Sequence, residues 1–314
     1  MKKLLPAIVS VILMLTILTF IFIPAKLSVA ILRPVNTTYT GFDTCLHNLE
    51  KWKQWWPGKS GRSGNDSLFI YNGITYKLSA PLRDGASIQI KSGGTNLESR
   101  IQTVTTNRDS VMAEWRIVLQ SGNNPWTRLS HYFFAKKIKK SMTVIFDSLC
   151  QFAGKTENIY NYPIERTTFT EVNLIAYRFK SNGYPTTENI YDAIHKLRQY
   201  LKSHGATEKY YPMMNNLQAG SSQFENMIAI SIDKQIPGNG EFFISKMVPM
   251  KDRFLRTELT GGPSSINNAH KAIEKYMLDH ALPAPAIPFE ILVSERNKVT
   301  DTGSWKTIIF YPTM

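Results

Sequence analysis

The chain has 314 residues, enough for two ordinary domains, and its 43% hydrophobic and 19% charged residues exclude a largely disordered protein. Lysine plus arginine number 37 against 24 for aspartate plus glutamate, and the net charge of +13 is compatible with nucleic acid, anionic lipid or simple solubility. Two cysteines, Cys45 and Cys150, are too few for a disulfide scaffold and lack the paired spacing of a zinc site, so we expect buried free thiols.

The amino-terminal segment is uncharged and mostly apolar from Leu4 to Ile23. As a helix it would be about 30 Å long, which predicts a transmembrane anchor over residues 1–25. A cleaved signal peptide ending at Ser28-Val29-Ala30 is the alternative, but the apolar run is longer than a typical signal core. Lys2 and Lys3 favour a cytoplasmic amino terminus and a periplasmic body, with a cytoplasmic body or a cleaved secreted form left open.

Residues 26–157 have the pattern of one α+β domain. An extended stretch and a helix precede short apolar runs separated by Asn-Gly, Asp-Gly and Gly-Gly turns, which predict an antiparallel meander. A long amphipathic helix with four lysines on its solvent face follows, and laid across a curved sheet it would enclose an apolar cavity. Trp115, on the apolar face of the last strand of the meander, is a candidate ligand contact. The predicted elements are an extended segment at 26–35, a helix at 39–54, strands at 67–71, 74–78, 86–91, 98–106 and 111–120, an optional strand at 126–132, and a helix at 131–152.

A tryptophan motif, Lys-Trp-x-x-Trp-Trp-Pro-Gly, occupies residues 51–58 between the first helix and the meander. In this order of elements the segment resembles the polyketide-cyclase branch of the START-like (SRPBCC) superfamily. The resemblance implies a helix-grip fold around a cavity for hydrophobic ligands. We interpret the tryptophans themselves as packing residues.

Residues 165–314 show a faint internal repeat. A strand at 170–180 leads through Gly183-Tyr184-Pro185 into a helix that runs to His204, and Gly261-Gly262-Pro263 opens a second helix that runs to His280. Proline follows each histidine by eight residues, and strands at 227–233 and 305–311 close the two halves. The spacing predicts two copies of β-α-β-β.

This second domain resembles the GyrI-like effector-binding domain. The likeness rests on the strand Val172–Phe179, on Phe289-Glu290-Ile291 and on the closing strand 305–312. It implies a groove between the two halves, lined by aromatic residues and an acid, that holds bulky apolar cations. Ile308 occupies the place where the family often has glutamate, which weakens cation recognition. No helix-turn-helix with a basic recognition helix is evident, so we expect neither a transcription factor nor nucleic-acid binding.

Glu290 is the candidate ligand-facing acid because it interrupts an apolar strand, although a solvent-facing glutamate would fit the same alternation. Tyr177, Tyr211, Trp305 and Phe310 are the candidate aromatic walls. Neither a metal-binding histidine pattern, a phosphate loop nor a nucleophile elbow occurs, so we predict no catalytic residue, metal or cofactor. The sequence favours a membrane-anchored protein that binds hydrophobic or amphipathic small molecules, cations among them, without catalysis. A hydrolase acting through Glu290 and an ectodomain that binds a partner or lipid are the alternatives.

Overall fold

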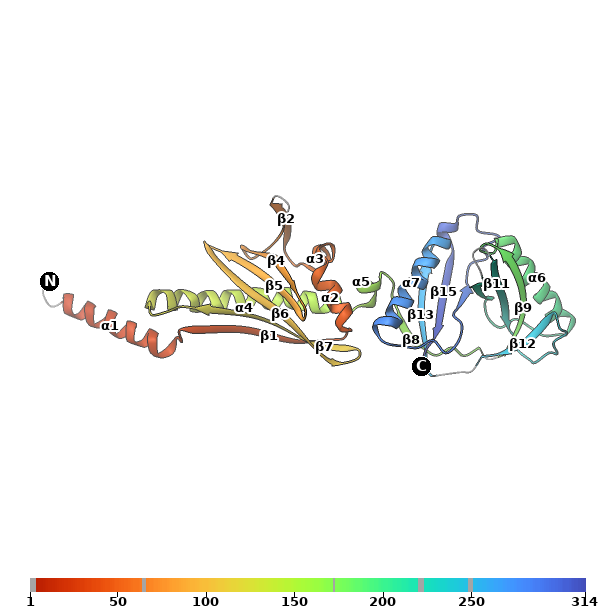
Figure 1. The fold of residues 1–314 in the computed structure, drawn as a ribbon, viewed down its shortest axis with the longest axis horizontal. Helices are drawn as coiled ribbons and strands as arrows, with labels where there is room; N and C mark the ends of the chain where they lie inside the picture. Colours follow the sequence, from red (N-terminus) through yellow and green to blue (C-terminus); the bar gives the residue numbers. More distant parts are fainter. Residues whose placement is uncertain (1–3, 64–65, 172, 220–222, 248–250) are drawn as a thin grey trace. The chain divides into compact units, whose positions relative to one another are not determined.

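The computed structural model describes residues 4–63, 66–171, 173–219, 223–247 and 251–314. The chain divides into two compact units, Met1–Lys155 and Thr156–Met314. Each unit has its own antiparallel sheet, of seven strands in the first and eight in the second (Figure 1). The predicted α+β class is therefore confirmed.

The amino-terminal helix α1 covers Leu4–Phe22. Within the described ranges, no helix is both long enough and apolar enough to cross a membrane. The prediction of a transmembrane helix is thus not supported by the fold. Lys2 and Lys3, on which the predicted orientation depends, lie outside the described residues.

The sheet of the first unit is a meander closed by its earliest strand. β1 (Lys26–Val35) pairs along its whole length with β7 (Ser110–Gln120), and the strand order is β1-β7-β6-β5-β4-β3-β2. The segment Lys-Ser-Gly-Arg-Ser forms β2, which the sequence did not indicate because it has no apolar alternation. The remaining strands are β2 (Lys59–Ser63), β3 (Asp66–Tyr71), β4 (Ile74–Leu82), β5 (Gly85–Ser92) and β6 (Thr95–Asn107).

The helix predicted at 39–54 is two helices, α2 (Tyr39–His47) and α3 (Leu49–Trp55). Asn48 separates them in an extended conformation, and its side chain accepts hydrogen bonds from the backbone N–H groups of Glu50 and Lys51. An asparagine cap satisfies amide donors that have no partner in the first turn of a helix. The apolar periodicity continues through this break, which is why the sequence pattern concealed it.

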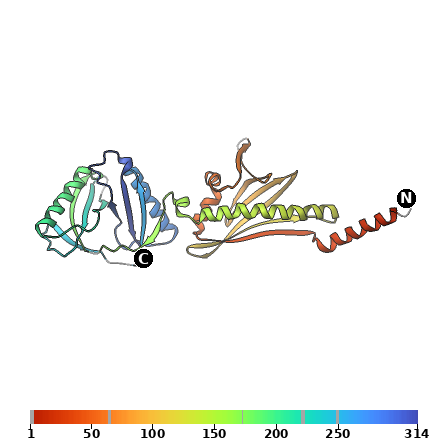
Figure 2. The ribbon, with the colours of Figure 1, turned by 180° about the vertical axis from the view of Figure 1, so that it is seen from behind.

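The long helix α4 spans Pro125–Ala153 and packs along β1 (Figure 2). It begins before the predicted start, and the optional strand at 126–132 was wrong. The Asn124 side chain accepts hydrogen bonds from the N–H groups of Trp126 and Thr127, and Pro125 occupies the first turn, where a missing N–H costs nothing. As predicted, the four lysines at 136, 137, 139 and 140 are exposed.

A continuous chain of aromatic rings fills the interior of the first unit. It runs from the tryptophan motif on α3 across the sheet to α4, with neighbouring ring centroids between 4.8 Å for Trp52–Trp55 and 6.1 Å for Tyr76–Trp115. The motif therefore packs in the core of the first unit, as interpreted from the sequence. The members of the chain are Trp52, Trp55, Trp56, Phe69, Tyr76, Trp115 and Phe146.

The second unit contains the two predicted β-α-β-β copies. The first consists of β9 (Asn173–Asn182), α6 (Thr187–Ser203), β10 (Met213–Gln218) and β11 (Gln223–Ser231), and the second of β13 (Phe254–Thr260), α7 (Pro263–Asp279), β14 (Phe289–Leu292) and β15 (Lys306–Pro312). The sheet order β12-β9-β11-β10-β14-β15-β13-β8 joins them through β10 and β14. The additional elements are α5 (Thr156–Tyr160), β8 (Glu165–Thr167), β12 (Phe242–Lys246) and a 3-10 turn at Thr302–Ser304.

The two long helices of the second unit, α6 and α7, cover the same face of its sheet. α6 packs on β9 and β11, and α7 packs on β13 and β15, so that the helices lie on the two flanks (Figure 1). Because opposed residues of an antiparallel pair point to the same side, the pairings Met214↔Glu290 and Glu290↔Ile309 place these three residues on the helix face. Met213, Ile291 and Ile308 point to the opposite face.

Candidate functional site

The residues predicted to bind ligand do not form one site. Trp115 belongs to the first unit, where it is 1% exposed, packs edge-on against Tyr76 and Phe146, and donates a hydrogen bond from Nε1 to Ser99 Oγ at 3.0 Å. Its polar group is satisfied and its ring is surrounded, so it is a core residue. The other five candidates lie in the second unit.

Tyr177 and Tyr211 lie away from Glu290. Tyr177 is half-buried on β9, stacks near Phe179, and its hydroxyl accepts a hydrogen bond from Lys196 Nζ on α6 at 3.2 Å. Tyr211 is 47% exposed and borders a polar surface pocket that also contains Arg198. Neither ring is positioned to cover a cation held by Glu290.

Glu290 is buried on the helix face and is paired with a cation of its own chain. It is 3% exposed, Oε2 lies 3.2 Å from Arg296 Nη2, and Oε1 lies 3.4 Å from His270 Nε2. Arg296 is itself buried, donates to Thr307 Oγ1 at 2.9 Å, and stacks its guanidinium 4.9 Å from the ring of Trp305. The carboxylate thus has the partner that a buried charge requires. Glu290 is therefore neither a free counter-charge for a cationic ligand nor a glutamate that faces solvent.

A hydrogen-bonded chain extends from this pair to α7. His270 Nδ1 lies 2.8 Å from the hydroxyl of Tyr311, which donates to Glu274 at 3.1 Å. Burial, reinforced by Glu274, raises the pKa of Tyr311, so its hydroxyl keeps its proton. These residues border a groove of about 730 Å³ along α7 that is lined by Met214, Asn215, Asn216, Leu217, Gln218, Phe224, Asn267, His270, Glu274, Met277, Leu278, Leu282, Ala284, Pro288, Phe289, Glu290 and Tyr311.

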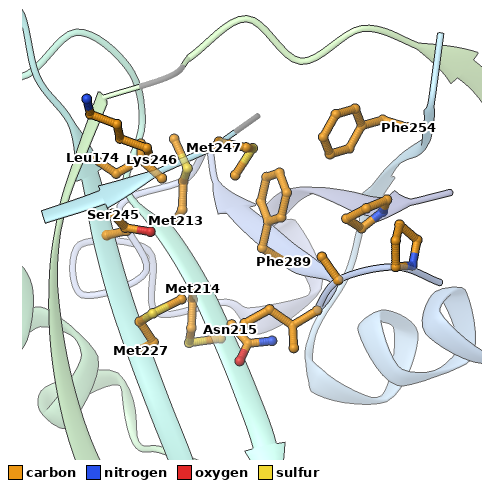
Figure 3. Close-up of a pocket in the computed structure, with 15 residues that line it drawn as sticks. Leu174, Met213, Met214, Asn215, Met227, Ser245, Lys246, Met247, Phe254 and Phe289 are labelled. Carbon is orange, nitrogen blue, oxygen red and sulfur yellow. The ribbon is translucent and has the colours of Figure 1, made fainter. Parts of the chain in front are cut away.

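A second, mostly apolar pocket lies on the sheet face that carries no helix. Its volume is about 390 Å³, and four of the chain's 11 methionines line it. Figure 3 shows Met213, Met247 and Phe289 directed into one space, with Met214 and Met227 lying together at its lower side. The described residues that line it are Leu174, Met213, Met214, Asn215, Met227, Ala229, Ser245, Lys246, Met247, Phe254, Pro285, Ala286, Ile287, Phe289 and Pro312.

Among the described residues that line this methionine pocket, none is acidic and Lys246, at the exposed end of β12, is the one charged residue. Ile308, the residue that replaces the acid often found in GyrI-like domains, is buried in the apolar cluster beside the pocket. Phe310 belongs to the same cluster, with its ring stacked 5.3 Å from that of Phe289. The pocket therefore suits an apolar body without a positive charge.

No sequence pattern predicts the two features that define these sites. The members of the methionine pocket come from residues 174 to 312 and meet only through the strand order. Arg296 lies in the loop after β14, six residues beyond Glu290, where no periodicity applies. Among the residues described, no group of three or more His, Cys, Asp or Glu side chains is placed to hold a metal ion.

Comparison with known proteins adds only weak similarities of fold. No protein-family model matches the chain, and no curated protein matches its sequence. The crystal structure of the EcmrR C-terminal domain is 14% identical with a TM-score of 0.42, over 49% of this chain and 98% of that one. A hydrolase from Listeria innocua is 13% identical with a TM-score of 0.36, over 48% of this chain and 91% of its own. CalU16 from Micromonospora echinospora is 14% identical with a TM-score of 0.30, over 41% of this chain and 77% of its own.

Proposed function

We propose that the second unit is a GyrI-like domain that binds a neutral or anionic, largely apolar small molecule in the methionine pocket. The observation that carries this proposal is a pocket of about 390 Å³ whose described lining is mostly apolar and includes four methionines and no carboxylate. Pockets of this size accept small organic ligands, and methionine side chains adapt to ligands of different shape. Lys246 at the rim would favour an anionic or polar head group over a cation.

In this proposal the ligand is recognised by the methionine pocket and not by Glu290. A ligand cation at Glu290 would compete with Arg296, which already neutralises the carboxylate at 3.2 Å in a buried setting. The cationic ligands that the family resemblance implies are therefore not the class that we propose for this chain. The first unit, whose interior is occupied by aromatic rings, acts in this account as a START-like scaffold and not as a second ligand carrier.

We also propose that α1 attaches the chain to a membrane, with the body on the exported side. The support is the apolar surface of α1, on which Leu13, Met14, Ile21 and Phe22 are between 61% and 74% exposed. Contiguous apolar surface of this kind is rare on soluble proteins unless something covers it. Extraction of cell membranes with carbonate, followed by protease treatment of intact cells or vesicles, tests attachment and sidedness. Release of the full chain by carbonate would contradict firm attachment.

The ligand proposal is tested by titrating the full chain with three probes: a neutral naphthylamine dye, a fatty acid and tetraphenylphosphonium. We expect saturable binding of the first two and none of the third. Ser245→Trp, which places a large ring at the half-buried edge of the pocket, should weaken binding, whereas Ser304→Trp, at an exposed position outside the pocket, should not. Tight binding of the cation, unaffected by Ser245→Trp, would overturn the proposal.

A hydrolase acting through Glu290 is the competing function, because Glu290 and His270 border the groove along α7. Both carboxylate oxygens are engaged, Oε1 by His270 and Oε2 by Arg296, which leaves the group poorly placed to activate water. Turnover of an ester or epoxide substrate that is abolished by Glu290→Gln in a variant that remains folded would favour this alternative.

A further inference from the structure

The exposed side of α4 has an unusual order of side chains. Trp126 and Phe133 are 74% and 61% exposed, and a spacing of seven residues places them on the same side of the helix. Lys137 and Lys140 continue that side, and Lys136 and then Lys139 extend it around one flank of the helix. We call these six residues, Trp126, Phe133, Lys136, Lys137, Lys139 and Lys140, the α4 Trp–Lys face. Large exposed aromatic rings at one end and four cations at the other form a strongly amphipathic surface.

This face begins where α4 meets α1. Arg128 Nη1 donates to the carbonyl oxygen of Ile23 at 3.1 Å, and its guanidinium lies 4.3 Å from the ring of Phe20. Trp126 and Leu129 of α4 line an apolar pocket of about 330 Å³ together with residues of α1. The aromatic end of the face is thus held against the carboxyl-terminal end of the apolar helix.

The charge of the face is not balanced by α4 itself. No aspartate or glutamate occurs between Pro125 and Phe146, and the first acid of the helix, Asp147, is paired with Arg33 at 2.6 Å. Four exposed lysines within five residues therefore present a local positive field. A surface that is both apolar and cationic is complementary to the headgroup layer of an anionic bilayer, where tryptophan and lysine are favoured residues.

We propose that the α4 Trp–Lys face lies on an anionic phospholipid surface, with Trp126 and Phe133 at the level of the headgroups and the four lysines against lipid phosphates. This inference rests on the proposed attachment through α1 and goes beyond it, because it assigns a second lipid contact to the folded body. By the helical rise, Trp126 and Lys140 are about 21 Å apart along α4, so the face would hold the first unit against the membrane over a substantial length. A protein partner on the same face is the rival occupant.

Trp126 offers a selective probe of this contact. The chain has six tryptophans, all in the described ranges, and the other five are no more than 8% exposed. The full chain would be reconstituted into vesicles made with brominated phosphatidylcholine, with or without phosphatidylglycerol. The difference in fluorescence emission between the parent chain and Trp126→Phe is the emission of Trp126. We expect bromine to quench this emission in the anionic vesicles and to quench it less in purely zwitterionic ones.

The lysine contribution is tested by replacing Lys136, Lys137, Lys139 and Lys140 with Gln. Each lysine near an anionic surface contributes about a fivefold gain in binding, so the quadruple variant should lower the equilibrium constant for docking of the face by several hundredfold, on the order of 600. A matched variant that removes four exposed lysines elsewhere should leave the quenching unchanged. Suitable positions are Lys91, Lys202, Lys271 and Lys306.

Flotation of the same vesicles distinguishes loss of the α4 lipid contact from loss of the attachment through α1. Chain that floats while Trp126 remains unquenched would retain attachment through α1 and overturn the lipid contact of α4. Chain that does not float would overturn both. Quenching that is equal in zwitterionic vesicles, or unaffected by the quadruple variant, would refute the role of the lysines in binding anionic lipid.

Discussion

The buried pair between Glu290 and Arg296 is predicted to stabilise the fold and not to bind the ligand. Their side chains are 4% and 1% exposed, and the two atoms of the pair lie 3.2 Å apart. Glu290→Gln leaves a buried guanidinium without its counter-charge, and breaking a buried pair in this way costs about 3–5 kcal/mol. For a domain of this size 1 kcal/mol corresponds to roughly 2–4 °C, so even the lower figure predicts a fall of about 6–12 °C in the Tm of the second unit.

Scanning calorimetry of the full chain is the assay, with a double variant and a surface control. Glu290→Leu combined with Arg296→Met removes both charges and should recover most of the loss, since apolar replacement of a buried pair is often neutral. Glu258→Gln removes a partner of an exposed pair with Arg256 and should change stability by less than about 1 kcal/mol. If Glu290→Gln melted within 2 °C of the parent, roughly the effect of 1 kcal/mol or less, or if the double variant were no more stable than the single one, the structural role would be refuted.

Local geometry also predicts the behaviour of the two thiols, of one helix cap and of one glycine. Burial raises the pKa of the Cys45 thiol to about 11 and that of Cys150 to about 12, so both should resist Ellman's reagent at pH 8 in the folded chain and react after denaturation. Because the folded pKa values exceed the usual value of 9.0, the stabilisation present below pH 9 should decline as pH rises towards 11, which urea titrations at several pH values would detect. Asn48→Ala removes the cap of α3 and should cost about 1 kcal/mol in the same titrations; an unchanged midpoint would contradict the cap. Gly58→Ala would place a Cβ 2.0 Å from the carbonyl oxygen of Ile70 and should destabilise the first unit more than the cap variant does.

Much of the fold was predictable because its elements repeat a simple period. The strands of the first meander alternate and are separated by glycine turns, and the two halves of the second unit share a Gly-x-Pro sequence before the helix and a histidine at the helix end. Prediction failed where one polar residue overrode the periodicity. Asn48 divides one apolar stripe into two helices, and Asn124 with Pro125 starts α4 where alternation alone indicated a strand.

The sites were less predictable, because they depend on which strands become neighbours. Glu290 is an unusual residue in an apolar strand, but the sequence left open whether it is buried or faces solvent, and its partner Arg296 is positioned by a loop. Met213 and Met247 are 34 positions apart in the numbering, and only the crossing of the sheet brings them to one pocket. Tyr177 and Trp115 were predicted to contact a ligand, but each packs within its own unit. Tyr177 contacts Lys196 on α6, and Trp115 lies in the aromatic core.

The most direct test of the central claim uses the methionines as reporters. With 13C-methyl methionine, the chain gives signals from 11 residues, and conservative Met→Leu variants assign them. Addition of the neutral or fatty-acid probe should shift the signals of Met213, Met227 and Met247, which line the pocket and not the groove along α7, while Met277, which lines the groove and not the pocket, stays in place. Shifts at Met277 with Met213 and Met247 unchanged would place the ligand in the groove beside Glu290 and contradict the account.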